Sequence, residues 1–336
     1  MPATTTPAQL AAALPDLAGI RAAKVLVDAV FPGTAQYAWP LLRRRHGFEI
    51  VVKHENHTPT GAFKVRGGIV YLDRLKRERP QVRGVVSATR GNHGQSIAMA
   101  AAKAGLPSII VVPLGNSVEK NAAMRAFGAE LVETGRDFDE ARAAAQGIAR
   151  QHGYEMVPSF HPDLVRGVAT YGLELLTARP DLARVYVPIG LGSGICGLIA
   201  ARDALGLATE IVGVVAQAAD AYALSVEAGR VVATDSAATF ADGMAVRTPD
   251  PGALATIIAG AARVVRVGDD AIAEAIRTYH TDTHNLAEGA GAAALAAAAQ
   301  EAALNRGSAV GVILCGGNID MPVFQSVLAG RTPVVG

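Results

Sequence analysis

Lys64 follows Phe63 inside the glycine-flanked segment of residues 58–68, and among the side chains of this sequence it has the clearest chemical potential. A lysine is normally a solvated surface charge. Once its amine is desolvated beside a ligand, however, it becomes a nucleophile that forms an imine with an aldehyde. We therefore interpret Lys64 as the attachment point of an aldehyde, with an ordinary surface lysine as the alternative.

Three further turns contain residue types that bind anions. They occupy residues 87–95, 189–194 and 315–318, and each places glycines after an apolar run. Such a turn can present backbone N–H groups at the N-terminus of a helix, where a phosphate or carboxylate is stabilised. Each turn alone also fits a simple tight turn, and residues 192–197 match the dinucleotide-binding spacing by chance.

The elements that would position these turns alternate along the chain. Short β-branched runs predict strands at residues 49–53, 82–87, 108–112, 130–133, 184–188, 210–215, 264–267 and 309–314. Helices are predicted between them, for example at residues 95–104, 118–127, 138–151 and 271–279. Because several runs are apolar on both faces, we expect an open α/β sheet of parallel strands covered by helices, with ligands where strands end.

The composition favours a small-molecule partner. The 336 residues can fill one large or two modest α/β domains. With 31 basic and 30 acidic residues the net charge is +1, so neither nucleic acid nor a membrane is an expected partner. The alanine-rich residues 287–304 contain Glu288, Gln300 and Glu301, and they predict a buried helix rather than a membrane span.

The cysteines and the N-terminus bear on the cellular compartment. Cys196 and Cys315 lie far apart in glycine-rich, apolar surroundings, which argues against a disulfide and for a reducing compartment. The first apolar stretch, residues 10–14, is short, is broken by Pro15 and follows no basic residue, so a secretory signal is not expected. The sequence predicts a cytoplasmic protein.

Residues 60–67, Thr-Gly-Ala-Phe-Lys-Val-Arg-Gly, resemble the cofactor-lysine motif of fold-type II pyridoxal-phosphate (PLP) enzymes, in particular the threonine and serine dehydratase and serine racemase group. Further motifs resemble the same family in the family's order, and they are residues 91–95, 190–194, 241–246, 288–292 and 315–318. The resemblance covers the chain from about residue 51 onward. Coincidence explains one motif but not an ordered series.

The resemblance implies an α/β fold of the fold-type II, tryptophan synthase β-like kind, with two open α/β domains and the cofactor in the cleft between them. Residues 1–67 and 160–336 would form the large PLP-binding domain, and residues 68–159 would form a small mobile domain. Closure of the cleft would exclude water from the reaction.

The resemblance also implies a role for each matching residue. Lys64 would carry PLP as a Schiff base and remove the Cα proton of the substrate, with Phe63 packed near the ring. Asn92 would bind the 3′-oxygen of the cofactor, and Cys315 would face the pyridine nitrogen. The cofactor phosphate would lie on a turn formed by Gly190, Leu191, Gly192, Ser193 and Gly194. The substrate would bind a second turn formed by Thr89, Arg90, Gly91, Asn92 and His93.

The implied activity is that of a dehydratase, or ammonia-lyase, which converts a β-hydroxy-α-amino acid to a 2-oxo acid and ammonia by eliminating water. A neutral thiol at the ring nitrogen gives no anion to keep that nitrogen protonated, and this favours loss of a β-leaving group over transamination. Residues 87–92 resemble the catabolic threonine-dehydratase-like branch, which acts on phenylserine, 3-hydroxyaspartate or hydroxyectoine-derived compounds, while threonine and serine are the default substrates. An amino-acid racemase and a non-catalytic PLP-binding protein are the alternatives, and a homodimer is an assembly to test.

Two positions depart from the family pattern. Arg90 stands where relatives often have serine or alanine, and because a serine there donates the second proton of racemisation, its absence argues against a racemase. Arg90 is expected either to bind an acidic or bulky substrate side chain or to face solvent. Gln217 stands where relatives often have a cation-binding glutamate, which leaves only Asp220 and puts metal dependence in doubt.

Two histidine pairs have the spacing of metal ligands. His54 and His57 are three residues apart, and His280 and His284 are four apart on a predicted helix. Neither pair has a third ligand nearby in the sequence, so we predict no metal site.

Overall fold

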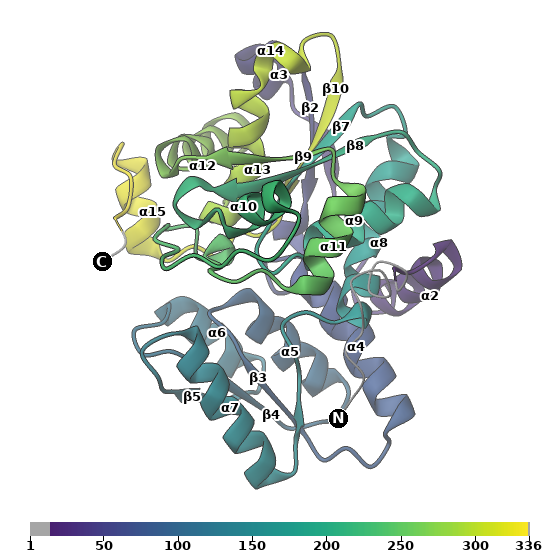
Figure 1. Cartoon of the computed structure of the whole chain (residues 1–336), viewed down its shortest axis with the longest axis vertical. Helices are drawn as coiled ribbons and strands as arrows, with labels where there is room; N and C mark the ends of the chain where they lie inside the picture. Colours follow the sequence, from purple (N-terminus) through teal and green to yellow (C-terminus); the bar gives the residue numbers. More distant parts are fainter. Residues whose placement is uncertain (1–13, 335–336) are drawn as a thin grey trace.

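The computed structural model describes residues 14–334, which form a larger and a smaller α/β part, each built on its own sheet (Figure 1). The larger part has a six-stranded sheet with the order β1 (Gln36–Ala38), β2 (Glu49–His54), β10 (Ala309–Leu314), β7 (Arg184–Pro188), β8 (Glu210–Ala216) and β9 (Arg263–Val267). The smaller part has a four-stranded sheet with the order β5 (Glu130–Glu133), β4 (Ser108–Val112), β3 (Val85–Ala88) and β6 (Glu155–Met156).

All strand pairs are parallel except β1 with β2, which is antiparallel. Every residue of β3, β4 and β7 is buried, as expected for strands covered on both faces. The predicted α/β architecture with parallel sheets is therefore confirmed. The structure adds the short strands β1 and β6, and it starts β3 at Val85 rather than at residue 82.

Helices cover both faces of the larger sheet. The alanine-rich helix α13 (Gly289–Gln300) is buried against β7, β8, β9 and β10, and it ends before the short helix α14 (Ala302–Asn305). Helices α8 (Pro162–Ala178) and α9 (Ser193–Ala204) pack on each other, and α9 also contacts β7 and β8. The remaining helices of this part are α2 (Leu17–Asp28), α3 (Pro40–His46), α10 (Ala221–Ala228), α11 (Pro251–Gly260), α12 (Asp269–Thr283) and α15 (Met321–Leu328).

Alternation along β3 and β4 explains how the smaller sheet is covered. Val85 and Ile110 belong to one core with α5 (Asn92–Lys103), whereas Val86 and Ile109 belong to a second core with α7 (Phe138–His152). Successive strand residues point to opposite faces, so each helix covers one face. Helix α6 (Val118–Ala126) packs on α5 and β5.

Helix α4 (Lys64–Glu78) packs against both α5 and α8 and so contacts both parts. The predicted domain boundary at residue 67 falls inside this helix, and the division into a large and a small mobile domain stays a prediction. Residues 1–13 and 335–336 of the predicted large domain, and most of the apolar stretch at residues 10–14, lie outside the described residues. Within residues 14–334, no helix is both long and apolar enough to cross a bilayer.

Candidate active site

Lys64 is the first residue of α4, and contacts with the turn after β10 fix the backbone just before it. The N–H of Phe63 donates to the carbonyl oxygen of Cys315 at 3.0 Å, and Ala62 pairs with Gly316 in an isolated antiparallel bridge. The Lys64 amine lies 5.3 Å from the centre of the Phe63 ring. The turn after the last strand is thereby joined to the segment that carries the lysine.

Burial lowers the pKa of Lys64 below its ordinary value of 10.5, while Cys315 and Glu288 oppose part of that shift. Burial also raises the pKa of the Cys315 thiol well above its ordinary value of 9.0, so this thiol is uncharged at neutral pH. Burial raises the pKa of Glu288 as well, while the charge of Lys120 opposes that rise. A lowered pKa increases the fraction of neutral amine, which is the form that attacks a carbonyl group.

The turn between β7 and α9 has backbone donors without protein acceptors. Gly192 has a φ of 97°, a left-handed conformation that favours glycine, and it precedes Ser193, the first residue of α9. In the described chain, the N–H groups of residues 190–194 donate to no protein acceptor. A Cβ at Gly190 would lie 2.3 Å from the carbonyl oxygen of Gly243, so only glycine fits there. Free N–H groups at a helix N-terminus make this turn an anion site.

Tyr171 on α8 connects this turn to the lysine segment. Its hydroxyl donates to the carbonyl oxygen of Gly194 at 2.7 Å, and its ring meets the Phe63 ring edge-on, with 6.1 Å between ring centres. Burial raises the pKa of Tyr171 well above 10.0, so the hydroxyl remains a donor. The predicted phosphate turn and the predicted lysine segment are therefore neighbours.

The turn before α5 is shaped by Thr89. Its buried hydroxyl oxygen accepts from the N–H groups of Gly91 at 2.9 Å and Gly94 at 3.2 Å. Further along α5, the Ser96 hydroxyl donates to the carbonyl oxygen of Lys64 at 2.7 Å. The structure thus brings the predicted substrate turn, in the smaller part, up to the predicted cofactor lysine.

Asn92, the first residue of α5, is held by side chains from the larger part. Its amide nitrogen donates to Glu288 Oε1 at 2.6 Å, and its amide oxygen accepts from Asn318 Nδ2 at 2.8 Å. Asn318 also donates to the carbonyl oxygen of Thr60 at 2.8 Å. The Asn92 amide nitrogen has two N–H groups and, among residues 14–334, a single acceptor, so one N–H is left for a ligand.

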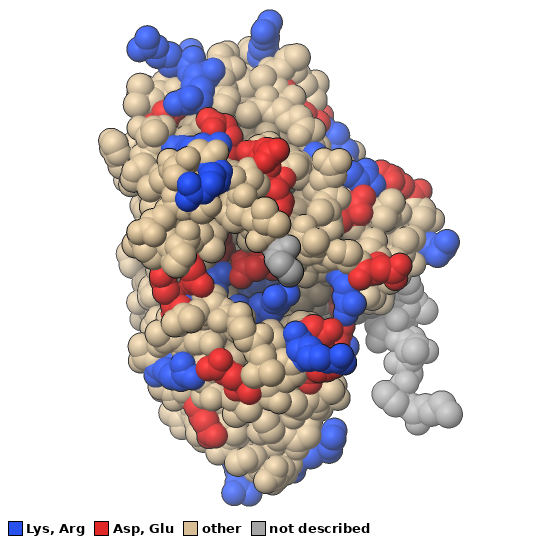
Figure 2. Space-filling model, turned by 90° about the vertical axis from the view of Figure 1, so that its left-hand side faces the viewer, with Lys and Arg blue, Asp and Glu red and all other residues tan. Residues whose placement is uncertain are grey.

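A buried lysine extends this chain of contacts across the two parts. Lys120 on α6 donates to Asp242 Oδ2 at 2.7 Å, and its amine lies 3.4 Å from Glu288 Oε2. Burial alone would lower the pKa of Lys120, but Asp242 and Glu288 outweigh it and raise that pKa. The lysine therefore stays charged between its two carboxylates. Figure 2 shows the surface hollowed between the two parts, with acidic and basic side chains gathered in the hollow.

His93 and Arg90 occupy different surroundings. His93 is buried, and among the described residues its Nε2 atom has no hydrogen-bond partner. Burial, together with the charge of Lys64, lowers the pKa of His93 to about 3, so its ring is neutral. Arg90 is exposed and makes no recorded ion pair or hydrogen bond with any residue from 14 to 334. The structure does not join Arg90 to the other predicted site residues.

Three of the residues considered as metal ligands, His54, His57 and Asp220, have protein partners of their own. His54 Nε2 accepts from Trp39 Nε1 at 3.0 Å, and its ring stacks on His57 with 4.9 Å between centres. Asp220 pairs with Arg266 at 2.8 Å. Over residues 14–334, no three His, Cys, Asp or Glu side chains come together as a metal site.

Lys120 and Tyr171 are site residues that the sequence reasoning did not single out, and Glu288 entered it only as the first residue of the motif at residues 288–292, without a role. A signal existed for Glu288, because it is an acid directly before the apolar, alanine-rich stretch of α13. Lys120 and Asp242 are separated by 122 residues, so their pairing has no local signature. Tyr171 likewise depends on the packing of α8 against the turn before α9.

Comparisons with known proteins agree with this arrangement. The family described as "Pyridoxal-phosphate dependent enzyme" matches residues 32–316. The chain is 38% identical over 283 residues to L-threonine ammonia-lyase of Geobacter sulfurreducens, covering 84% of this chain and 70% of that protein. It is 32% identical over 285 residues to L-threo-3-hydroxyaspartate ammonia-lyase of a Pseudomonas species, covering 84% of this chain and 89% of that protein.

A solved structure gives the same result for the fold. The processed form of threonine deaminase isoform 2 from Solanum lycopersicum superposes with a TM-score of 0.86 at 28% identity, covering 94% of each chain. The two chains therefore share one overall fold.

Proposed function

Since the chain belongs to the family of pyridoxal-phosphate dependent enzymes, we propose that it is an ammonia-lyase that converts a β-hydroxy-α-amino acid to a 2-oxo acid and ammonia. The observation that carries this proposal is the position of Lys64, an amine of lowered pKa at a turn of free backbone donors. The ammonia-lyases among its relatives support the reaction class.

The residues around Lys64 fit the cofactor. The free N–H groups of residues 190–194 suit a phosphate, Lys64 suits an aldehyde, and Cys315 suits a ring nitrogen. Asn92 has an unused N–H for the ring oxygen. When bound, pyridoxal phosphate would supply an electron-withdrawing ring conjugated to the substrate nitrogen, which acidifies the Cα–H bond.

The protein groups then act on the substrate. Lys64 removes the Cα proton, a role that requires the neutral amine, and a lowered pKa increases the fraction of that form. The N–H groups of Arg90, Asn92 and His93, which donate to no acceptor in the described chain, receive the substrate carboxylate. Cys315 is uncharged and so does not hold a proton on the ring nitrogen, which favours departure of the β-hydroxyl over transamination.

Arg90 is the residue that we assign to substrate choice. It follows Thr89 in the substrate turn, it is exposed, and no recorded ion pair within the described residues uses its charge. A guanidinium in this position can form a bidentate pair with a side-chain carboxylate, as in 3-hydroxyaspartate, or stack on an aromatic ring, as in phenylserine. The side chains of threonine and serine have neither a carboxylate nor an aromatic ring for the guanidinium to bind.

Two finer statements belong to the same proposal. We place the protein in the cytoplasm, because both cysteines are free and buried. We also propose a homodimer, for which the exposed Tyr37 on the edge strand β1 and the exposed Leu41 on α3 offer apolar surface. Size-exclusion chromatography with light scattering measures the assembly directly.

An absorbance spectrum and a substrate panel test the function. A band near ~410 nm on addition of the cofactor is expected for its covalent attachment. Threonine, serine, phenylserine and 3-hydroxyaspartate stereoisomers are then assayed for 2-oxo acid and ammonia, and L-serine is followed for conversion to D-serine. Interconversion of L- and D-serine without release of ammonia would show that the protein is a racemase and not a lyase. A protein that shows the band but turns over no substrate would be a cofactor-binding protein only.

A further inference from the structure

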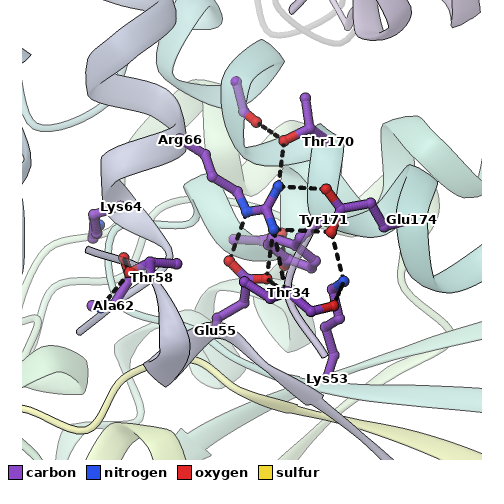
Figure 3. Close-up of polar contacts among 12 residues, drawn as sticks. Thr34, Lys53, Glu55, Thr58, Ala62, Lys64, Arg66, Thr170, Tyr171 and Glu174 are labelled. Carbon is purple, nitrogen blue, oxygen red and sulfur yellow. Dashed lines mark hydrogen bonds and ion pairs between the residues drawn. The ribbon is translucent and has the colours of Figure 1, made fainter. Parts of the chain in front are cut away.

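We propose that Arg66 is a positioning residue, which fixes the first turn of α4 and thereby the direction of the Lys64 amine. It does so through a buried group of side chains, here called the Arg66 network: Thr34, Lys53, Glu55, Arg66, Thr170 and Glu174 (Figure 3). The proposal rests on the proposed role of Lys64 as the cofactor lysine.

The Arg66 guanidinium is fully buried, and protein acceptors occupy its donors. Nε and Nη2 donate to the two carboxylate oxygens of Glu55 at 2.7 and 3.0 Å. Nη1 and Nη2 donate to the two oxygens of Glu174 at 2.8 and 2.9 Å. Nη1 also donates to the Thr170 hydroxyl at 3.0 Å. Nη2 also lies 3.3 Å from the Thr34 hydroxyl. Five N–H groups thus meet six acceptor atoms, and two carboxylates bind the planar guanidinium from different directions.

These acceptors come from elements on two sides of α4. Glu55 follows β2 in the 3-10 turn Glu55–His57, whereas Thr170 and Glu174 lie on α8. Lys53 on β2 completes the group, because its amine donates to Glu174 Oε2 at 2.6 Å and to the carbonyl oxygen of Thr34 at 2.9 Å. The start of α4 is therefore fastened both to the larger sheet and to α8.

Lys64 and Arg66 point to opposite sides of this helix turn. Residues two apart in an α-helix are rotated by about 200°, and Figure 3 shows Lys64 on the side of the ribbon away from the network. The other side of the turn is held by the Ser96 hydroxyl, which donates to the carbonyl oxygen of Lys64 at 2.7 Å. The Lys64 amine thus extends from a helical turn whose backbone is held by the contacts of Arg66 and Ser96.

Stability alone is a poor reason for this arrangement. Lys53, Glu55 and Arg66 are fully buried here and the Glu174 side chain is 9% exposed. Burying an ion pair often stabilises a protein no better than apolar side chains of equal volume. A network of this kind holds the backbone and side chains around it in one conformation. Because Arg66 is two residues from Lys64, we infer that the network fixes the direction of the Lys64 side chain.

The variants separate geometry from charge and from folding. R66K keeps the buried charge but cannot form the two bidentate pairs, and T170V removes a single hydrogen bond from Nη1 at nearly constant volume. R66M removes the charge as well. R184K is the matched control, because Arg184 on β7 is a buried arginine that donates to Glu210 on β8 at 3.1 Å and to Asn305 on α14 at 2.9 Å.

Each protein is loaded with pyridoxal phosphate and measured in four ways: the pH dependence of the absorbance band, borohydride trapping of the cofactor on Lys64, kcat with KM, and thermal melting. For R66K we expect the band to titrate at a different pH and kcat to fall on the order of tenfold to a hundredfold, with KM within about twofold. T170V should show the same changes more weakly. R184K should lower the melting temperature and leave the band and kcat unchanged.

The proposal is overturned if R66K and T170V lower only the melting temperature while the band titration and kcat stay those of the wild type. If R66M does not fold, R66K and T170V decide by the same criteria. A wild-type protein that traps no cofactor at Lys64 would instead refute the proposed function, and the role of Arg66 with it.

Discussion

The side-chain amide of Asn92 donates to Glu288 Oε1 at 2.6 Å, and this bond joins the first residue of α5 to the residue that precedes α13. It links a residue assigned to the cofactor with a buried acid of the other part of the molecule. Lys120 approaches the second oxygen of the same carboxylate at 3.4 Å. The residue that we propose for cofactor binding and the packing of the two parts therefore share the same contacts.

Replacing Lys120 by methionine tests the charge balance between the two parts. The variant leaves Glu288 buried without its cation, and we expect the free energy of unfolding to fall by about 2–3 kcal/mol. The loss should be smaller than for a fully buried pair, because the Asp242 side chain is 34% exposed. Urea denaturation measures it. Lys103→Met, on an exposed position of α5, is the control, and an equal loss in both variants would contradict the pairing.

Lys64→Ala should abolish covalent attachment of the cofactor and reduce 2-oxo acid production to background. The fold should survive, because the Lys64 amine has no recorded hydrogen bond within residues 14–334. Absorbance spectra with added cofactor, together with circular dichroism, check both statements. Lys103→Ala should keep the band. A Lys64→Ala protein that retained the band would sink the assignment of the cofactor lysine.

Arg90→Ala should change substrate preference without releasing the cofactor. If the guanidinium binds a side-chain carboxylate, its loss removes charged hydrogen bonds worth about 1.5–3 kcal/mol. The ratio of kcat/KM for 3-hydroxyaspartate to that for threonine should then fall about tenfold to a hundredfold. Arg83→Ala, another exposed arginine of the smaller part, is the comparison. An unchanged substrate profile would mean that Arg90 only faces solvent and does not bind the substrate.

Acid should destabilise the protein through its buried histidines. Burial, reinforced by His57, lowers the pKa of His54 to about 4 from 6.5, and burial lowers that of His93 to about 3. Below about pH 6.5 these histidines are therefore protonated in the unfolded chain but not in the folded protein. The free energy of unfolding falls as the pH drops from there toward the histidine pKa values of the folded protein. Each histidine contributes a slope of up to about 1.4 kcal/mol per pH unit.

Urea unfolding between about pH 5 and pH 7 measures this slope. His54→Gln should make it shallower by the contribution of one histidine. His152→Gln, at an exposed position near the end of α7, should leave it as in the wild type. A slope that did not change in His54→Gln would mean that His54 is not kept neutral by the fold.

Local patterns were enough to predict most of the fold. The buried runs that became β2, β4, β7 and β10 were visible because β-branched residues are confined to short apolar segments. Strands β1 and β6 were missed because they have three and two residues, too few for any alternation to be read. The break between α13 and α14 at Glu301 was also hidden by the continuous alanine pattern.

The site divides in the same way. Lys64 and the glycine turns could be predicted because backbone geometry and a reactive amine require particular residue types. Contacts between distant side chains could not, since Arg66 with Glu174 or Lys120 with Asp242 are ordinary charged residues until the chain is folded. Arg90 is the opposite case. The sequence singled it out, but within residues 14–334 its side chain makes no hydrogen bond or ion pair that would indicate its role.

The central position of β10 in the larger sheet has a consequence for synthesis on the ribosome. This strand, residues 309–314, lies between β2 and β7. The strand pairing of the larger sheet therefore cannot be completed until residue 314 has emerged. The smaller sheet uses only residues 85–156 and can assemble much earlier. During the interval β2 has an unpaired apolar edge, and such edges associate with other chains. The nascent protein is therefore expected to need a chaperone on its larger half, and the completed smaller half to resist proteolysis first.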